Sequence, residues 1–487
     1  MLNKLRELLF ANEGTKKVVF KNFLWLGIGQ VGGRLIRAAI TIYSARALGA
    51  AGYGVFSYAI GLAGFFVFFK NIGVDSIMTR DIAKHPESRD KIFSTGFWIE
   101  IVLLVVTAFL LLFVAPMFST VSDAIVLLPL VAIMFIADDM RDFVVAFFRG
   151  VEKMEWEAAI MTAANILVTI FGFVALALAR TPFSLMVAYT TASVVVTIVA
   201  LGILFIRYGV RVVRHFERAM VAPILRSAWP IAVSVLPSIF LFNVDLVMLG
   251  WWRSVTEVGV YSAAQKVIGI LALLPTLIAT STFPVFSRFA HQKDVSRSRE
   301  LMESTLRMMF AFCAPVVLGG SLLAAPLLLY LFGADYASGA GAFVILLFTI
   351  LSTYPLSIFT NFIFAHDLQK KLVYYPFISA GINLGLNYIL VPRLGMEGAS
   401  FASLVSFSVY AWLVYRLAKR IEYFSLFRSP AKVIISALVM AVVAGAMAFA
   451  NVHVVINIIL SATVYVGLLY ALKDESVRDI LSLIRNR

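Results

Sequence analysis

Cysteine, charge and histidine are all scarce in this sequence, and each scarcity excludes a class of protein. The single cysteine, Cys313, excludes a disulfide bond within the chain and a cysteine-rich metal site. Charged residues make up 14% of the 487 residues, too few to keep a domain of this size in solution. The five histidines form no ligand-like pair, and no Walker A loop is present. We therefore expect neither a histidine metal centre nor ATP hydrolysis by this chain.

The sequence is instead rich in long apolar runs. Hydrophobic residues make up 61% of the chain, and the mean hydropathy is +0.93. A helix needs about 20 apolar residues to cross a bilayer, and runs of that kind recur about fourteen times. The sequence therefore predicts an all-α integral membrane protein with about fourteen transmembrane helices.

The basic residues indicate the orientation of the chain. A net charge of +14 would suit a nucleic-acid-binding protein, but the lysines and arginines lie in short loops between apolar runs, so we expect no nucleic-acid partner. With the N-terminus cytoplasmic, most of these residues fall in cytoplasmic loops, and the opposite loops hold only Arg46, Arg180, Arg253 and Arg393. We expect a multi-pass protein of the cytoplasmic (inner) membrane with both termini cytoplasmic.

A faint internal repeat predicts the domain organisation. "GYGVFSYAIGL" opens the second apolar run and "EVGVYSAAQKVIGIL" the eighth, while Asn165 and Asn383 occupy similar mid-span positions. Two repeated halves around a central site are typical of transporters. We predict the following segments: an amphipathic cytoplasmic N-terminus that is not a signal peptide (1–21), a six-helix half (22–206), a cytoplasmic linker (207–225), a second six-helix half (226–418), two additional transmembrane helices (431–472) and a cytoplasmic tail (473–487).

Charged residues deep in the predicted spans are the strongest functional signal. Arg34 lies about 18 Å into the first helix, Arg37 one turn further, and Lys266 about 12 Å into the eighth. A charge at such depth is costly, so it is expected to face the bundle interior or a water-filled cavity. The spacing of the first helix places its polar residues on one face, which comprises Gln30, Arg34, Arg37, Thr41 and Ser44.

One acid, Asp245, lies at a comparable depth. It could pair with Lys266 or Arg37, and the simplest alternative is that these charges only neutralise one another inside the bundle. Three deep cations against one deep anion favour a cationic cavity instead. Because arginine binds phosphate through its planar fork, we predict that Arg34, Arg37 and Lys266, with Gln30 and Thr41, receive a phosphate or pyrophosphate group.

A second charged group lies near the cytoplasmic end of the fourth predicted helix. Asp138 and Arg141 are three residues apart and can pair on one helix face. We consider two interpretations: a cytoplasmic gate, or a solvated helix end.

The longest motifs resemble one family. "ARALGAAGYGVFSYAIGLAGFFVFFKNIGVDSIMTRDIAK", "NVDLVMLGWWRSVTEVGVYSAAQKVIGIL" and "INLGLNYILVPRLGMEGASFASLVS" are similar to stretches of polysaccharide and O-antigen flippases of the Wzx/PST type. These proteins belong to the multidrug/oligosaccharidyl-lipid/polysaccharide (MOP) superfamily. The resemblance implies two pseudo-symmetric halves around a cavity that opens alternately to either side. It also implies transport of polyisoprenyl-pyrophosphate-linked glycans, with Arg34 and Arg37 lining the cavity. Coupling to H⁺ or Na⁺ would be a further expectation, with Asp245 as the candidate residue.

The leading hypothesis is therefore a flippase, not an enzyme, that moves lipid-linked oligosaccharide or polysaccharide precursors for cell-surface polysaccharide synthesis. Its expected partners are the lipid-linked glycan, membrane lipids, and glycosyltransferases or polymerases of the same pathway. We expect no cofactor besides a coupling ion. The alternatives are an ion-coupled multidrug exporter of the same superfamily, a multispan glycosyl- or acyltransferase, and a passive scramblase. Three deep basic residues argue against export of organic cations. An enzyme would need acid/base groups, for which His366 and Asp367 are the nearest approach to a dyad.

Overall fold

The computed structural model describes residues 15–66, 72–210, 212–213, 215–426 and 431–474. The side chains of residues 15–31 and of Arg34 lie outside the described part. Most of the predicted N-terminal segment (1–21) and of the predicted cytoplasmic tail (473–487) also lies outside the described part. Of these two segments the structure describes only residues 15–21 and 473–474.

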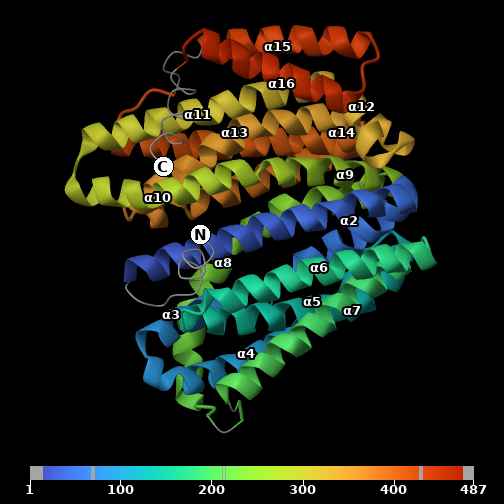
Figure 1. The fold of residues 1–487 in the computed structure, drawn as a ribbon. Coiled ribbons are helices and arrows are strands. Elements are labelled where there is room, and N and C mark those ends of the chain that lie inside the picture. Colours follow the sequence, from blue (N-terminus) through green and yellow to red (C-terminus); the bar gives the residue numbers. More distant parts are fainter. Residues whose placement is uncertain (1–14, 67–71, 211, 214, 427–430, 475–487) are drawn as a thin grey trace, which may run out of the picture. The chain divides into compact units, whose positions relative to one another are not determined.

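The described chain is helical throughout and contains no strand, which confirms the all-α prediction (Figure 1). The α-helices are α2 (Thr15–Phe66), α3 (Val74–Lys84), α4 (Arg89–Phe109), α5 (Ser122–Gly150), α6 (Met154–Leu178), α7 (Pro182–Gly202), α8 (Arg218–Trp252), α9 (Val255–Leu271), α10 (Leu273–Gln292), α11 (Val295–Leu322), α12 (Ala324–Phe332), α13 (Ala340–Ala365), α14 (Tyr374–Ile421), α15 (Ala431–Phe449) and α16 (Val454–Ala471). Short 3₁₀ turns (Pro86–Ser88, Ala115–Phe118, Ala334–Gly339 and Gln369–Leu372) and π-helical turns (Leu110–Val114 and Ile203–Arg207) extend or join them.

The number of membrane spans agrees with the prediction. Eleven described helical segments are long and apolar enough to cross a membrane. Two of these contain a kink that divides a longer helix, and α5 is long enough to span but carries the charged residues around Arg141. If each kinked segment counts as two spans and α5 counts as one more, the described chain has about fourteen spans.

The two kinks share a local motif. Gly49 divides α2 with φ 66°, and Gly395 divides α14 with φ 58°. Each glycine belongs to a Leu-Gly-x-x-Gly sequence, "LGAAG" or "LGMEG". Positive φ is costly for residues with a Cβ atom, so these glycines let the chain turn between two spans without a long loop.

The contacts divide the chain into unit 1 (Met1–Trp251) and unit 2 (Trp252–Arg487). The two units are the parts of the chain whose residues mostly contact one another, and this division does not test whether the chain contains two symmetric repeats. The predicted six-helix halves, 22–206 and 226–418, therefore stay a prediction, although α8 as far as Trp251 belongs to unit 1.

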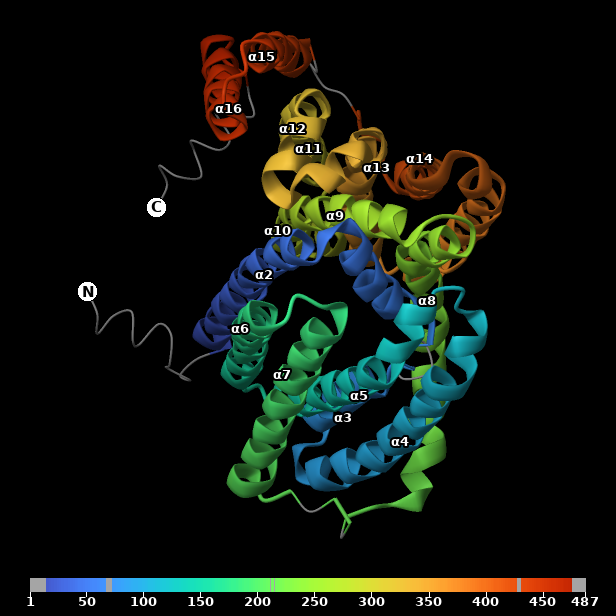
Figure 2. The same ribbon diagram turned by 90° about the vertical axis from the view of Figure 1, so that its right-hand side faces the viewer.

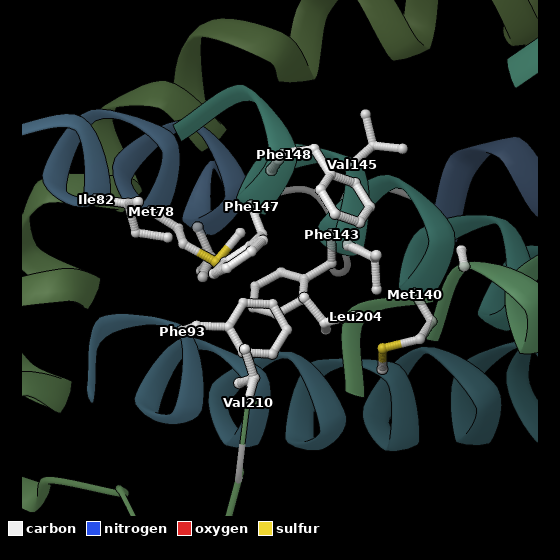
Figure 3. Packing of buried hydrophobic residues seen from close by; sticks show 14 of the residues in the cluster. Met78, Ile82, Phe93, Met140, Phe143, Val145, Phe147, Phe148, Leu204 and Val210 are labelled. Carbon is white, nitrogen blue, oxygen red and sulfur yellow. The ribbon is translucent and has the colours of Figure 1, made fainter. Parts of the chain in front are cut away.

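The core of unit 1 is rich in phenylalanine. Phe93 of α4 contacts Phe143 and Phe147 of α5, with ring centroids 5.1 and 5.3 Å apart (Figure 3). Met78 and Ile82 of α3 pack against the same cluster. This packing holds α3, α4 and α5 together.

In unit 2, α13 is the central helix and contacts α9, α10, α11 and α14. The two C-terminal helices, α15 and α16, lie side by side (Figures 1 and 2). They pack on α11 through a small cluster formed by Ala311, Val433, Ala437, Met440, Tyr465 and Leu469. The hydroxyl of Tyr465 donates to the carbonyl of Ala311 at 2.7 Å, which fastens α16 to α11.

Candidate functional site

The predicted polar face of α2 is only partly described. Arg37 is exposed, Thr41 is partly exposed and Ser44 is buried. The side chains of Gln30 and Arg34 lie outside the described part of the chain. Of the described members, Arg37 and Thr41 are accessible, while Ser44 belongs to the helix packing.

Helix α6 packs along α2 through contacts at Gly33, Ile36, Ile40 and Tyr43. It packs along α2 where Gly33 leaves room for Asn165, because a Cβ atom on Gly33 would lie 2.5 Å from the Asn165 amide nitrogen. One turn further, the Thr169 hydroxyl donates to the carbonyl of Ile36 at 3.4 Å. Arg37, one turn after Gly33, has an exposed side chain.

Helix α7 contributes to this site a residue that the sequence pattern did not indicate. Tyr189 lies near Thr41 and Arg37. Its ring packs edge-on against Phe56 at 5.3 Å, and Thr41 Oγ1 donates to the Arg37 carbonyl at 2.9 Å. We call Arg37, Thr41 and Tyr189 the Arg37 cluster. The available signal was the segment "AYTTAS", in which a tyrosine and several hydroxyl residues interrupt an apolar span.

Asp245 is completely buried in α8 and is engaged by other groups of the protein. Nearby, Asn243 packs against Gly64 of α2, so this part of α8 lies at a close helix–helix contact. Lys266 is exposed on α9 and belongs to unit 2. The pairing of Asp245 with Lys266 or Arg37, and a cavity that Lys266 shares with Arg34 and Arg37, stay predictions.

The charged group in α5 forms an ion-pair network. Arg141 Nη1 donates to Asp138 Oδ1 at 2.6 Å, and its Nη2 donates to Asp142 Oδ1 at 2.9 Å. The Arg141 side chain is only 9% exposed. The pairing that the sequence spacing allows is therefore present, and Asp142 completes it. The role of this group as a gate stays a prediction.

A second ion pair joins α5 to α6. Arg149 donates through Nε and Nη2 to both oxygens of Glu157, at 2.8 and 2.5 Å. The Glu157 side chain is 5% exposed. This fork holds the ends of the two helices together across the short turn between them.

His366 does not form a dyad with Asp367. Its Nε2 lies 3.3 Å from Glu422 Oε1, and its Nδ1 lies 2.9 Å from the carbonyl of Phe362. Among the described residues, no group of three or more His, Cys, Asp and Glu side chains is arranged to hold a metal ion.

The spans define the class of this protein: it is an all-α, multi-pass membrane protein. The family model described as "Polysaccharide biosynthesis protein" matches residues 19–290, more than half of the sequence. The chain therefore belongs to the polysaccharide biosynthesis protein family. A second family model, MatE, matches residues 230–389.

Curated relatives agree with this placement, and a solved structure shares the fold. "Probable flippase AglR" of Haloferax volcanii is 26% identical over 251 residues, 49% of this chain and 52% of that protein. The "Putative O-antigen transporter" of Shigella flexneri is 23% identical over 412 residues, 79% of this chain and 94% of that protein. The chain thus spans about half the length of the first relative and nearly all of the second. The lipid II flippase MurJ in an inward closed conformation has the same fold, with a TM-score of 0.77, 17% identity and coverage of 94% of this chain and 100% of that chain.

Proposed function

We propose that the protein moves lipid-linked oligosaccharide or polysaccharide precursors, of the polyisoprenyl-pyrophosphate type, across the cytoplasmic membrane by alternating access. The observation that carries the proposal is the Arg37 cluster, an accessible arginine beside two hydroxyl groups on membrane-spanning helices. The family of the chain and relatives named as flippases and transporters support it.

The chemistry of the cluster suits a phosphate-bearing head group. A guanidinium binds phosphate through two parallel hydrogen bonds, and the Tyr189 hydroxyl can donate to a remaining oxygen, while the Thr41 hydroxyl already donates to the Arg37 carbonyl. Sugar hydroxyls would lose their hydrogen bonds in hydrocarbon, so the head group needs a hydrated polar path, while the lipid tail remains in the bilayer. Arg34, Lys266 and Gln30 are proposed to extend this path.

The finer features follow from the same proposal. Both termini face the cytoplasm, because the basic loops then follow the positive-inside rule. The chain transports without catalysing a covalent reaction, and it works beside glycosyltransferases or polymerases that make and consume its substrate. Asp138 and Arg141 form part of a cytoplasmic gate that opens and closes with the alternation.

Reconstitution tests the proposal. The purified protein is placed in liposomes with a fluorescent polyisoprenyl-pyrophosphate oligosaccharide, and the fraction protected from an impermeant quencher is followed over time. Loss of a charge-assisted hydrogen bond in Arg37→Ala is expected to lower the transfer rate about tenfold or more. Arg180→Ala, in the exposed turn between α6 and α7, is the matched control and keeps the wild-type rate. Equal rates in Arg37→Ala and wild type would overturn the proposed phosphate site.

The match to the MatE family model favours one alternative, an ion-coupled multidrug exporter. Expression in a host that lacks its own drug pumps separates the two functions. Resistance to cationic dyes without glycan transfer would favour the exporter.

Ion coupling is a separate part of the proposal. A buried acid can bind H⁺ or Na⁺ when its surroundings change, so Asp245 is the proposed coupling residue. In the liposome assay, Asp245→Asn is expected to abolish any stimulation by an H⁺ or Na⁺ gradient. Stimulation that persists in this variant would exclude Asp245 from coupling, and a wild-type protein that no gradient stimulates would be a passive scramblase.

A further inference from the structure

The connection between α7 and α8 is strongly basic. Residues 207–218 contain four arginines and a single acid, Glu217. Two of the arginines, Arg207 and Arg218, belong to the described part of the chain, and both side chains are exposed. We call the described residues 207–210, 212–213 and 215–218 the α7–α8 strap.

Contacts with α4 fix the path of the strap. The carbonyl of Val212 accepts hydrogen bonds from the hydroxyl of Ser94 and from Trp98 Nε1, the latter at 3.2 Å. The amide of Glu217 donates to the Thr95 hydroxyl at 3.1 Å. The strap therefore follows the first turns of α4 on its way from α7 to α8 (Figure 2).

These contacts place the strap level with the apolar part of α4. The apolar run of this helix begins at Ile92, and Ser94 and Trp98 lie about 3 and 9 Å further along the helix axis. Segments that lie in the membrane interface enter the bilayer by about 5–10 Å. The strap therefore lies at the boundary between the lipid head groups and the acyl chains.

One side of the strap is packed and the other is apolar and exposed. Val210 belongs to the phenylalanine-rich core of unit 1 (Figure 3), and Val212 packs against it. Val213 is 76% exposed and Phe216 is 45% exposed. Insertion of such side chains among acyl chains is favourable in proportion to the apolar area that leaves water.

The charges of the strap are mainly positive. Its acid, Glu217, pairs with Lys91 of α4 at 3.0 Å. Arg207 lies at one end of the strap, with its guanidinium 5.2 Å from the ring centre of Trp156, and Arg218 lies at the other end. Each arginine near an anionic membrane surface favours the bound state about fivefold. The strap is therefore suited to negatively charged lipid head groups.

We infer that the α7–α8 strap binds an anionic membrane surface, with Val213 and Phe216 inserted among the acyl chains. Arg207 and Arg218 contact the lipid phosphates. A soluble acidic partner would leave the exposed apolar side chains without a partner at this depth, and a neutral leaflet would leave the arginines without a counter-charge. The inference requires that the helices span a membrane, and it does not depend on the transported substrate.

A single fluorescent label tests the insertion. Cys313, the one cysteine, is buried and is replaced by alanine, and Val213→Cys then carries the fluorophore NBD. The full-length protein is placed in nanodiscs, and reduction of the label by dithionite in the surrounding water is timed. His85→Cys, in the exposed turn after α3, is the matched control. With phosphatidylglycerol, reduction at position 213 is expected to be about tenfold slower than at position 85.

Lipid composition and charge variants test the recognition. With phosphatidylcholine in place of phosphatidylglycerol, reduction at position 213 is expected to be several-fold faster. The double variant Arg207→Gln/Arg218→Gln is expected to raise the rate in phosphatidylglycerol about fivefold or more. Arg288→Gln/Arg297→Gln, at two exposed arginines of unit 2, is the control and keeps the rate.

The apolar part of the strap has its own variant. Phe216→Ser is expected to raise the rate at position 213 in both lipids. The inference is overturned by equal rates at positions 213 and 85 in phosphatidylglycerol, by equal effects of the two arginine pairs, or by an unchanged rate in Phe216→Ser. Equal protection of position 213 in the two lipids would also overturn it, because protein or uncharged lipid would then cover the strap.

Discussion

Glu422 Oε1 lies 3.3 Å from His366 Nε2 and connects the residue after α14 to the residue after α13. Both side chains are largely buried, at 8% and 15% exposure. Beside them, the Phe424 ring lies 6.4 Å from that of Phe362, and the Ser425 amide donates to Glu303. The segment that leads from α14 towards α15 is therefore held by the His366–Glu422 contact, an aromatic contact and a hydrogen bond.

The first prediction is a pH dependence of stability. The hydrogen bond to Glu422 raises the pKa of His366 above its ordinary value of about 6.5. Because the folded state binds the proton more tightly, this contribution is fully present below about pH 6.5 and is lost as the pH rises through the raised value. Thermal unfolding in detergent is expected to show this loss in wild type and a flatter profile in Glu422→Gln. His291→Gln, at an exposed histidine, keeps the wild-type profile. Identical profiles for wild type and Glu422→Gln would contradict the prediction.

The second prediction concerns the kink in α14. Gly395 has φ 58°, where a Cβ atom costs about 1–2 kcal/mol. The added Cβ would also collide with the carboxylate of Glu257, which accepts a hydrogen bond from the Met396 amide at 3.3 Å. Gly395→Ala is therefore expected to lower the free energy of unfolding by about 2 kcal/mol or more. Gly385→Ala in the same helix has open space around it and is the control, with no loss expected. Equal stability of the two variants would disprove this account of the kink.

The third prediction addresses the Arg141 network. Removing Arg141 leaves two carboxylates close together in a partly buried site, whereas removing Asp138 leaves Asp142 as a partner. Arg141→Ala is expected to cost up to about 3 kcal/mol, below the full value of a buried pair because Asp142 is 45% exposed. Asp138→Asn is expected to cost clearly less. Chemical unfolding in mixed micelles compares the variants, and a larger effect of Asp138→Asn would reverse the assignment of Arg141 as the centre of the network.

The local parts of this structure could be predicted from the sequence, and the partners across the sequence could not. Apolar runs determine the spans because each span must satisfy its own backbone hydrogen bonds. The polar periodicity of α2 predicts that Arg37 faces a cavity, and its side chain is exposed in the structure, but the cavity itself stays a prediction. The periodicity did not distinguish the buried Ser44 from the exposed Arg37, because burial depends on which other helices pack against each turn of α2. Tyr189 lies far from Thr41 in sequence, and no local pattern brings the two together.

The fourth prediction concerns Tyr189. If its hydroxyl supports a phosphate beside Arg37, Tyr189→Phe removes one neutral donor and keeps the aromatic contact with Phe56. The apparent affinity for the lipid-linked glycan is expected to fall about three- to tenfold, less than in Arg37→Ala, because a neutral hydrogen bond contributes about 1 kcal/mol. Tyr43→Phe, on the same unit in contact with Phe173, is the control. A larger effect at Tyr43 than at Tyr189 would remove Tyr189 from the proposed site.

The fifth prediction tests how α15 and α16 are attached. The buried hydroxyl of Tyr465 donates to the Ala311 carbonyl at 2.7 Å, and the apolar cluster around it is small. Tyr465→Phe keeps the ring and removes this bond, so it is expected to weaken the attachment by about 1 kcal/mol. Protease cleavage before α15 is expected to become several-fold faster, since it follows the population of the detached state. Tyr470→Phe, at a tyrosine that is 68% exposed on the same helix, leaves the rate unchanged. If both variants are cleaved at the wild-type rate, the hydroxyl contributes nothing and the apolar cluster alone holds the two helices.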